Sequence, residues 1–559
     1  MPVVPVDFND LKALMGDKAK DLDKDTFMSR VPMIGSDIDG VDGDIVQVEF
    51  FPNRPDLYSV EGIARAMGAF FGFRPGLRTY DVGKPRTLLT IAESVMEVRP
   101  YMVAGVVHDI KFNGPFIKSL MDVQEKLHAS LGRNRKKVSI GLHDMDAVHP
   151  PFTYKAVDPE SVTFVPLDMQ EELDMRDILR KHPKGQEYGS IVSDHPKWPL
   201  LVDRDENVLS FPPIINGELT AVKEDTRNIF IDVTGLDMNG CLHALNILCA
   251  IFADRGATLE AVTVQYPGKV HVTPDMSPLS MKFKLDYVNR WLGTELSAKQ
   301  MIESLERMGH SAKVSEKNPL ELDVCYPAYR KDVLHPVDIA EDVAIGFGYE
   351  RLEPLLPVAR TTGHPRPVET ASHRYRKCLI GLGYLEVATL TLSNEADEYS
   401  KLGIEPGPRS SIQNPLTVDF TMMRVSLIPS LLRTLKVNKH ADMPQKIFEA
   451  ADVVLGHHNI RHVGALTMHE KANFTEMKSL VQRVLEDMRL KYKFEQFEAP
   501  GYLKGRCAAI LVDLGHEKVH GKGHHAKFDQ VGHFGELSPQ TITNFELEFP
   551  IAAFEMKVL

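Results

Sequence analysis

One short motif occurs twice in this chain, and the repeat limits the folds that the chain can adopt. In both copies an arginine and an aspartate precede an apolar pattern with helical spacing, which predicts a turn followed by a helix. Ser59 is a suitable N-cap for the first helix. The residues that match, with identical spacing, are Arg54, Asp56, Ile63 and Ala64 in the first copy and Arg330, Asp332, Ile339 and Ala340 in the second. We therefore expect two related helix-containing modules, separated by a central region.

The second copy of the motif carries extra acidic residues. A helix over residues 337–347 would have an apolar stripe on one side and acids on the opposite side. The four carboxylates of this copy are Asp332, Asp338, Glu341 and Asp342. In the first copy, Arg65 and Ala66 occupy the places of Glu341 and Asp342. A duplicated scaffold explains the shared residues, but it does not explain these acids.

Length and composition are those of a globular protein with several domains. The chain has 559 residues, 43% of them apolar and 25% charged, and a formal net charge of -12. The acidic balance argues against a self-sufficient nucleic-acid binder, although it does not exclude an RNA substrate. The five cysteines form no CxxC pair, so we expect neither a disulfide framework nor a zinc site, and a reducing cytoplasm fits best. No apolar run is long enough for a membrane span.

The pattern of the chain predicts a multidomain α+β fold. Short β-patterned runs fill the region from about residue 100 to 267, with one helix that ends at Gly256, which indicates a mixed α+β domain. The proline-rich stretch 351–367 is typical of a linker. From about residue 370, the pattern predicts an amphipathic helix in "ASHRYRKCLIGLGY", then strands, a second helix in "VSLIPSLLRTLKVNKH" and short closing strands. This order favours an antiparallel sheet with helices on one face.

Three clusters of polar residues have a local explanation. The basic run Arg133, Arg135, Lys136 and Lys137 is typical of a solvated loop, and contact with an RNA backbone is the alternative. We interpret His143, Asp144, Asp146 and His149 as turn residues at a strand end. No cysteine or carboxylate completes a zinc site with His516, His520, His524 and His525, so we expect a loop there.

Five motifs together resemble one known family. They are "FFPNRPDLYSVEGIARAMGAFFG", "PPIINGELTAV", "YRKDVLHPVDIAEDVAIGFGY", "NPLTVDFTMMRVSLIPSLL" and "FGELSPQTITNFELEFPIAAFE". In this order they resemble the β subunit of phenylalanyl-tRNA synthetase, in its short archaeal form, over nearly the whole chain. The resemblance implies an α2β2 assembly with a catalytic α subunit and tRNA(Phe) as the RNA partner. It also implies four parts: an N-terminal module (1–88), an editing-type domain (89–268), an acidic-helix module (269–354) and a class II synthetase-like core (355–559).

The resemblance offers a use for the acidic helix. It implies that Asp332, Asp338, Glu341 and Asp342 hold Mg²⁺ in a site shared with the α subunit. Magnesium prefers oxygen ligands and needs only one or two direct carboxylates, so the set is chemically adequate. The alternative is structural, because acids at the start of a helix complement its dipole and an acidic face can be solvated or meet a basic partner.

The last domain is expected to lack catalytic activity of its own. A working class II site grips ATP phosphates with arginines. Glu449 lies in "KIFEAADVV" without the arginine expected before it, and "PIAAFEMKVL" lacks the glycines and the arginine of the third motif. We therefore predict a degenerate domain that leaves amino-acid activation to the α subunit.

The central domain is expected to edit. An apolar phenylalanine pocket cannot strongly reject tyrosine, so a second, hydrolytic site is needed. From the resemblance we assign Leu201, Ser210, Asp232 and Thr234 to this site, with Asn216 a weaker candidate. Asp232 and Thr234 alternate along a strand and so share a face. The alternative is that these two residues cap the helix that follows.

We therefore predict the β subunit of a cytoplasmic phenylalanine–tRNA ligase. With an α subunit it would charge tRNA(Phe) in an ATP-dependent reaction, and it would itself hydrolyse mischarged tyrosyl-tRNA(Phe). The alternatives are a stand-alone aminoacyl-tRNA deacylase and a purely structural subunit.

Overall fold

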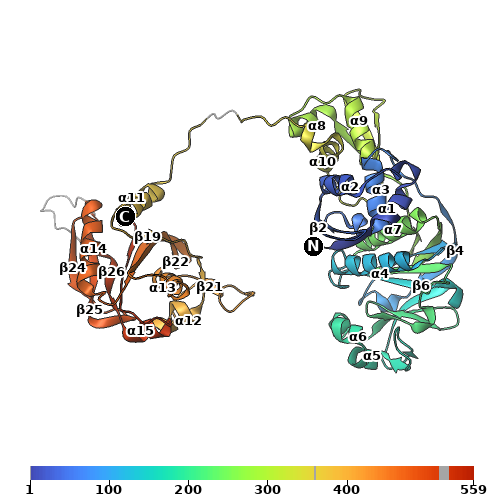
Figure 1. Cartoon of the computed structure of the whole chain (residues 1–559). Helices are drawn as coiled ribbons and strands as arrows, with labels where there is room; N and C mark the ends of the chain where they lie inside the picture. Colours follow the sequence, from blue (N-terminus) through green and yellow to red (C-terminus); the bar gives the residue numbers. More distant parts are fainter. Residues whose placement is uncertain (1, 358–360, 515–527) are drawn as a thin grey trace. The chain divides into compact units, whose positions relative to one another are not determined.

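The computed structural model of the chain describes residues 2–357, 361–514 and 528–559 (Figure 1). The chain divides into two compact units, one ending at Leu356 and the other beginning at Pro357. Both units combine helices and sheets, which confirms the predicted multidomain α+β fold. The finer boundaries at residues 88, 268 and 354 stay predictions. No described helix is long and apolar enough to cross a bilayer.

The N-terminal part of the first unit is a small sheet with helices. Its strands are β1 (Val3–Asp7), β2 (Ser36–Asp42) and β3 (Ile45–Phe50), and its helices are α1 (Phe8–Met15), α2 (Lys24–Arg30) and α3 (Val60–Phe70). Strand β3 lies in the middle of the antiparallel sheet. The side chain of Ser59 accepts a hydrogen bond from the Gly62 amide at 3.1 Å, so the predicted N-cap is confirmed.

A second small sheet carries the other copy of the motif. It consists of β16 (Leu279–Lys284), β17 (Ser311–Val314) and β18 (Glu321–Tyr326), with helices α8 (Leu285–Leu292), α9 (Ala298–Arg307) and α10 (Pro336–Phe347). Strand β18 is again the central strand, and it ends as far before Arg330 as β3 ends before Arg54. The repeat therefore includes the strand before the motif as well as the helix after it.

A ten-stranded sheet forms the centre of the first unit. Its strands are β4 (Val82–Ile91), β5 (Tyr101–His108), β6 (Val138–Asp144), β7 (Phe152–Val157), β10 (Trp198–Val202), β11 (Val208–Phe211), β12 (Ile215–Asn216), β13 (Ile229–Gly235), β14 (Thr258–Tyr266) and β15 (Lys269–Thr273). The order is β12-β11-β10-β7-β4-β14-β5-β13-β6, and β15 pairs with β14. Helices α4 (Gly114–Ala129) and α7 (Met238–Asp254) share one hydrophobic core with this sheet.

Strand β13 shows how the central sheet exposes polar groups to one side. Ile229, Ile231 and Val233 belong to the core beneath α4 and α7. Because side chains alternate along a strand, Asp232 and Thr234 lie together on the opposite face. Helix α7 is capped by Asp237, whose side chain accepts from the amides of residues 239 and 240. The alternative interpretation of Asp232 and Thr234 as helix caps is therefore wrong.

The second unit contains a seven-stranded sheet in the order β19-β22-β23-β27-β26-β25-β24. Its strands are β19 (Leu385–Glu386), β22 (Gln445–Leu455), β23 (His458–Met468), β24 (Tyr492–Gln496), β25 (Tyr502–Asp513), β26 (Phe528–Leu537) and β27 (Ile551–Lys557); its longer helices are α11 (Pro367–Gly381), α13 (Ile428–Val437) and α14 (Phe474–Asp487). All neighbouring strands are antiparallel except β19 and β22.

The helices of the second unit cover both faces of its sheet, so the prediction of helices on one face is wrong. In strand β22, Phe448 and Ala450 join the core with α11 and α14, whereas Ile447 and Val453 join the core with α13. The strand is apolar on both sides, and each side needs its own cover.

Candidate functional site

A cavity of about 390 Å³ opens between α4, strands β6 and β13, and the segment that contains β11 and β12. Three of the residues predicted for editing line it: Ser210, Asn216 and Asp232. The polar face of β13 thus reaches an enclosed space large enough for an amino-acid side chain. Leu201 and Thr234 are not among the residues that line it.

Asp232 is held by a histidine that we interpreted as a turn residue. The Nε2 of His143 lies 2.7 Å from Asp232 Oδ2, and its Nδ1 lies 2.8 Å from the Thr220 hydroxyl. Both His143 and Asp232 are at most 2% exposed. The turn interpretation is therefore wrong for His143, which fixes the position of the carboxylate in the cavity wall.

A glycine makes the pair between Asp232 and His143 possible. Gly141 lies directly opposite Asp232 on β6. A Cβ at this position would come within 2.2 Å of Asp232 Oδ2 and 2.8 Å of His143 Nε2, which is closer than atoms can pack. The Asp232 carboxylate therefore occupies the space that a side chain at position 141 would fill.

Thr234 supports the site from behind the cavity. Its hydroxyl lies 2.8 Å from the Ser139 hydroxyl and accepts a hydrogen bond from Arg99 Nε at 2.9 Å. The buried Arg99 also donates to the carbonyls of Arg135 and Lys136. Thr234 therefore belongs to a buried network that connects β13 with the basic loop.

Ser210 has a buried hydroxyl with no hydrogen-bond partner among the described residues. Its neighbour across the β10–β11 pair is Leu201, which is fully buried in the hydrophobic core. Asn216, opposite Ser210 on β12, donates from Nδ2 to the Leu142 carbonyl at 3.3 Å. Of the candidate residues, Ser210 offers an unused polar group inside the cavity.

The basic loop has both buried and exposed members. Arg135 is 8% exposed, donates to the Ile214 carbonyl at 2.9 Å and pairs with Glu125 at 2.8 Å. The hydrogen bond from His128, together with the charge of Arg135, lowers the pKa of Glu125 to about 2. Lys137 pairs with Asp237. Arg135 is thus part of the cavity wall, and Arg133 and Lys136 are the two members that stay exposed.

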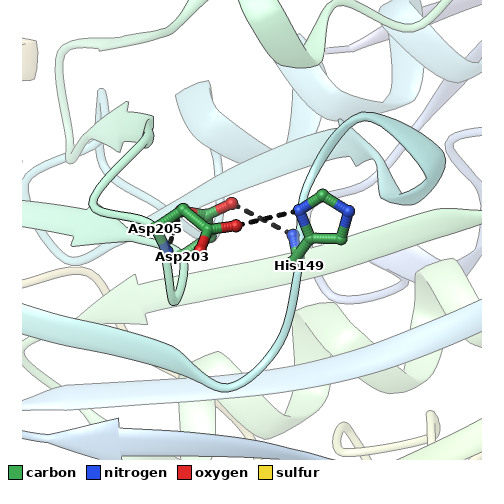
Figure 2. Close-up of side chains that lie close together, drawn as sticks. All are labelled: His149, Asp203 and Asp205. Atoms are coloured by element: carbon green, nitrogen blue, oxygen red, sulfur yellow. Dashed lines mark hydrogen bonds and ion pairs between the residues drawn. The ribbon is translucent and has the colours of Figure 1, made fainter.

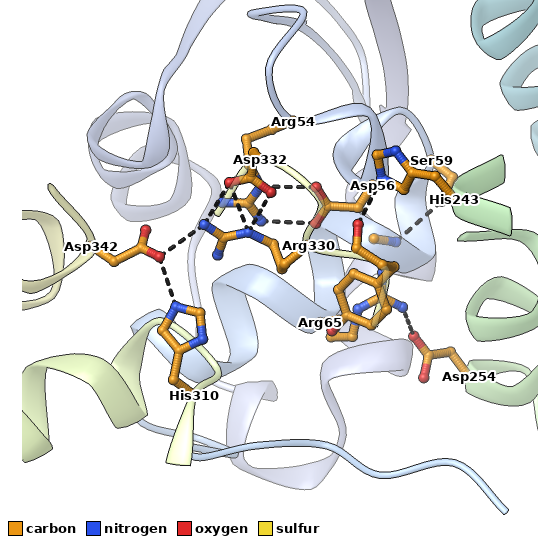
Figure 3. Close-up of polar contacts among 12 residues, drawn as sticks. Arg54, Asp56, Ser59, Arg65, His243, Asp254, His310, Arg330, Asp332 and Asp342 are labelled. Atoms are coloured by element: carbon orange, nitrogen blue, oxygen red, sulfur yellow. Dashed lines mark hydrogen bonds and ion pairs between the residues drawn. The ribbon is translucent and has the colours of Figure 1, made fainter. Parts of the chain in front are cut away.

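The two copies of the motif meet in a buried ionic cluster (Figure 3). Arg54 forms a bidentate pair with Asp56, with both bonds at 2.8 Å. Arg330 contacts both oxygens of Asp332 and also Asp342, whose Oδ2 lies 2.7 Å from His310 Nε2. Burial alone would raise the pKa of Asp342, but Arg330 and His310 hold it well below its usual range.

The acidic helix does not present a closed magnesium site. Arg330 already binds Asp332 and Asp342, and Asp338 accepts from the backbone amides of Leu334 and His335 as a helix cap. Burial, followed by the charges of Asp342 and Asp338, raises the pKa of Glu341. Among the described residues, Asp332, Asp338, Glu341 and Asp342 do not bring three ligand atoms within 4.8 Å of one another.

Among the described residues, His149, Asp203 and Asp205 do bring three possible ligand atoms within 4.8 Å of one another (Figure 2). Asp203 accepts hydrogen bonds from the backbone amides of His149, Asp205 and Asn207 and from the Asn207 side chain. These bonds outweigh burial and lower the pKa of Asp203. The contacts of His149 are with residues 54 and 56 positions further along the chain, so they fasten the β10–β11 turn to the loop at His149 and are not the local turn bonds that we predicted there.

Two other predictions have different outcomes. Asp144 accepts from the Asp146 amide at 3.0 Å, so the predicted local turn bond is confirmed. The histidines considered for zinc, His516, His520, His524 and His525, lie outside the described residues.

Glu449 in the second unit is fully engaged with protein groups. Its carboxylate accepts two bonds from the buried Arg424, at 3.1 and 3.2 Å, and two more from the Thr389 amide and hydroxyl. The arginine that binds Glu449 therefore comes from a distant segment and serves the fold.

Known proteins resemble the whole chain. The family models for the B3/4 domain, the tRNA synthetase B5 domain and the phenylalanyl tRNA synthetase beta chain CLM domain match residues 107–244, 281–349 and 352–558. These three family models, together with the modules and the cavity described above, place the chain in the tRNA synthetase class.

Curated relatives identify the family. The phenylalanine–tRNA ligase beta subunit of Archaeoglobus fulgidus is 43% identical over 100% of this chain and 98% of its own length. That of Methanosarcina barkeri is 41% identical, with the same coverage. A crystal structure of an N-terminal fragment of the phenylalanyl-tRNA synthetase beta-subunit from Pyrococcus horikoshii is 35% identical, with a TM-score of 0.60, over 62% of this chain and 100% of the fragment. The chain belongs to the phenylalanine–tRNA ligase beta subunit family.

Sequence reasoning missed His143, Gly141 and Arg99. One signal was available: "SIGLHD" alternates Ser139, Gly141 and His143 along one face of a strand, as "FIDVTG" alternates Asp232 and Thr234. Nothing in the sequence indicated that these two strands are neighbours.

Proposed function

We propose that this chain acts with an α subunit in the ATP-dependent charging of tRNA(Phe) with phenylalanine, and that its central cavity hydrolyses mischarged tyrosyl-tRNA(Phe). The family to which the chain belongs supports the first part. The unpartnered hydroxyl of Ser210 in the cavity carries the second.

A phenol is a suitable partner for Ser210. A buried hydroxyl without a partner loses its hydration and gains nothing in return, at a cost of about 1–3 kcal/mol. The hydroxyl of a bound tyrosine would remove this cost, whereas phenylalanine would leave it in place. The cavity would thus favour the wrong amino acid, as an editing site must.

Asp232 is the second group that we assign to editing. His143 holds its carboxylate in a fixed orientation at the cavity wall. A fixed carboxylate can orient a water molecule toward the ester that joins the amino acid to tRNA. In this proposal Thr234 positions the strand, and Leu201 supports Ser210 from the core.

Removal of the Ser210 hydroxyl is the direct test of editing. We expect Ser210→Ala, in the assembled complex, to lower tyrosyl-tRNA(Phe) deacylation by about tenfold, which is the worth of one hydrogen bond to a buried hydroxyl. Deacylation is measured by release of labelled tyrosine. Ser430→Ala is the matched control, because Ser430 is also 2% exposed with an unpartnered hydroxyl but lies in the second unit. Equal rates for the two variants would contradict the assignment.

The charging part has its own test. We expect the chain alone to show no phenylalanine-dependent pyrophosphate exchange, because the second unit lacks the arginine before Glu449. We expect the complex with the α subunit to have an α2β2 mass and to charge tRNA(Phe). Size measurement and charging assays with each chain and with both decide this. Exchange by the isolated chain would overturn the division of labour. A stand-alone deacylase would instead hydrolyse tyrosyl-tRNA at the full rate without the partner.

We further propose that magnesium at Asp332, Asp338, Glu341 and Asp342 requires ligands from the α subunit. The Glu341 side chain is exposed and has no salt bridge with any described residue, so it could contribute to a cation site, whereas Arg330 already contacts Asp332 and Asp342. The exposed Arg133 and Lys136 remain candidates for contact with the tRNA backbone.

A further inference from the structure

The duplicated helices carry opposite charge at one equivalent position. Arg65 in α3 occupies the place of Glu341 in α10, directly after the matched alanines Ala64 and Ala340. The first copy thus places a cation where the second copy places a carboxylate. A cluster of cations around Arg65 would favour an anionic ligand.

A cavity of about 290 Å³ lies beside α3 in the first unit. Its walls include Arg65, Arg74 and Arg78, and no Asp or Glu is among its lining residues. Gly309 and Tyr329 of the second copy of the module close it from another side. Arginines from two segments of the chain thus surround one space that contains no carboxylate.

The arginines around this cavity outnumber their internal partners. Arg65 and Arg78 share the carboxylate of Asp254, to which Arg78 Nη1 lies at 3.2 Å (Figure 3 shows Arg65 and Asp254). The Arg74 side chain is exposed and forms no hydrogen bond or ion pair with any described residue, although its backbone amide donates to the Gly68 carbonyl. Three guanidinium groups therefore face one carboxylate, which leaves two positive charges.

One donor of this set is buried and unused. The Arg65 side chain is 7% exposed, and its Nη1 binds Asp254, but its Nη2 has no hydrogen-bond partner among the described residues. The Tyr329 ring lies 4.3 Å from the Arg65 guanidinium and fixes its plane. A buried N–H group of this kind requires an acceptor oxygen, and this one belongs to a side chain that lines the cavity.

We propose that this cavity binds a phosphate group. Inorganic phosphate carries a charge of about −1.5 to −2, which matches the two unbalanced positive charges, and phosphate oxygens suit the planar fork of a guanidinium. The arginine cavity, as we name this set of Arg65, Arg74 and Arg78, lies outside the proposed editing site. A phosphodiester of the tRNA backbone carries one negative charge, and it presents the same kind of acceptor oxygen to the guanidinium groups as inorganic phosphate does.

The test uses the full chain and the variant Arg74→Ala, which removes a charge without breaking a hydrogen bond or ion pair of the side chain. Inorganic phosphate is titrated at constant ionic strength and followed by calorimetry and by the shift in Tm. tRNA(Phe) binding is measured over a range of salt concentrations. The matched control is Arg86→Ala, because Arg86 is 86% exposed and lies outside the cavity.

The outcomes separate the two sources. Phosphate binding that weakens about tenfold in Arg74→Ala, and not in Arg86→Ala, supports a site for free phosphate. If inorganic phosphate does not bind but the salt dependence of tRNA binding falls by about one phosphate contact in Arg74→Ala alone, the ligand is the RNA backbone. If neither quantity differs between Arg74→Ala and Arg86→Ala, the proposal is overturned. None of these outcomes depends on editing activity.

Discussion

Gly141→Ala is expected to reduce tyrosyl-tRNA(Phe) deacylation by the assembled complex about 100-fold, while phenylalanine charging stays unchanged. The added Cβ would come within 2.2 Å of Asp232 Oδ2, so the carboxylate and His143 must move apart. Displacement of a positioned group by about 1 Å typically costs this much in rate. The rate of tyrosine release measures the effect.

Two further variants serve as controls for this prediction. Gly114→Ala is the matched glycine control, because a Cβ there would meet nothing within 4 Å, and we expect its deacylation rate to equal that of the unmodified protein. Asp232→Asn keeps the size of the side chain but removes its charge, and we expect a loss in the same direction. A folded Gly141→Ala protein with an unchanged deacylation rate would show that Asp232 has no part in editing.

Arg330→Met is expected to lower the free energy of unfolding of the first unit by about 3–5 kcal/mol. Arg330 is the cation that binds both Asp332 and Asp342, and the Asp342 side chain is only 4% exposed. Removal of one partner from a buried ion pair leaves a charge without compensation, which costs about this much. Urea unfolding followed by tryptophan fluorescence is a suitable measurement, because Trp198 and Trp291, the two tryptophans of the chain, both lie in the first unit.

The control for Arg330 is a surface arginine of the same module. Arg290 is 72% exposed and lies 3.7 Å from Asp286 one turn away on α8, so Arg290→Met is expected to change stability by less than about 1 kcal/mol. If Arg330→Met cost no more than this control, the ionic cluster would not stabilise the fold.

Arg330 and Asp232 illustrate how far the sequence could predict the site. The repeat predicted that Arg330 and Asp332 belong to a module, and the alternation of Asp232 and Thr234 predicted a shared strand face. Neither pattern indicated that Asp342 shares Arg330 with Asp332, or that His143 holds Asp232. His143 and Asp232 are 89 residues apart and Arg330 and Asp342 are 12 apart, whereas the periodicity of a helix or strand relates residues only within one element.

The second unit shows the same limit at the level of the fold. Helices α11 and α13 overlap the two helices that the sequence pattern predicted, but α14 was not predicted, and the helices cover both faces of the sheet. Glu449 likewise lacks a neighbouring arginine in the sequence and receives Arg424 from another segment.

The sequence by itself determined the local elements of this protein: the cap at Ser59, helices α3 and α10, the strand face of Asp232, and the family shown by its motifs. Each depends on backbone geometry and on the periodicity of side chains over a few residues. The tertiary structure alone decided which of these groups meet, which charges are neutralised, and which donors remain free. The physical reason is burial: an unpaired buried charge or hydroxyl costs free energy, so its partner is whichever polar group the fold places beside it.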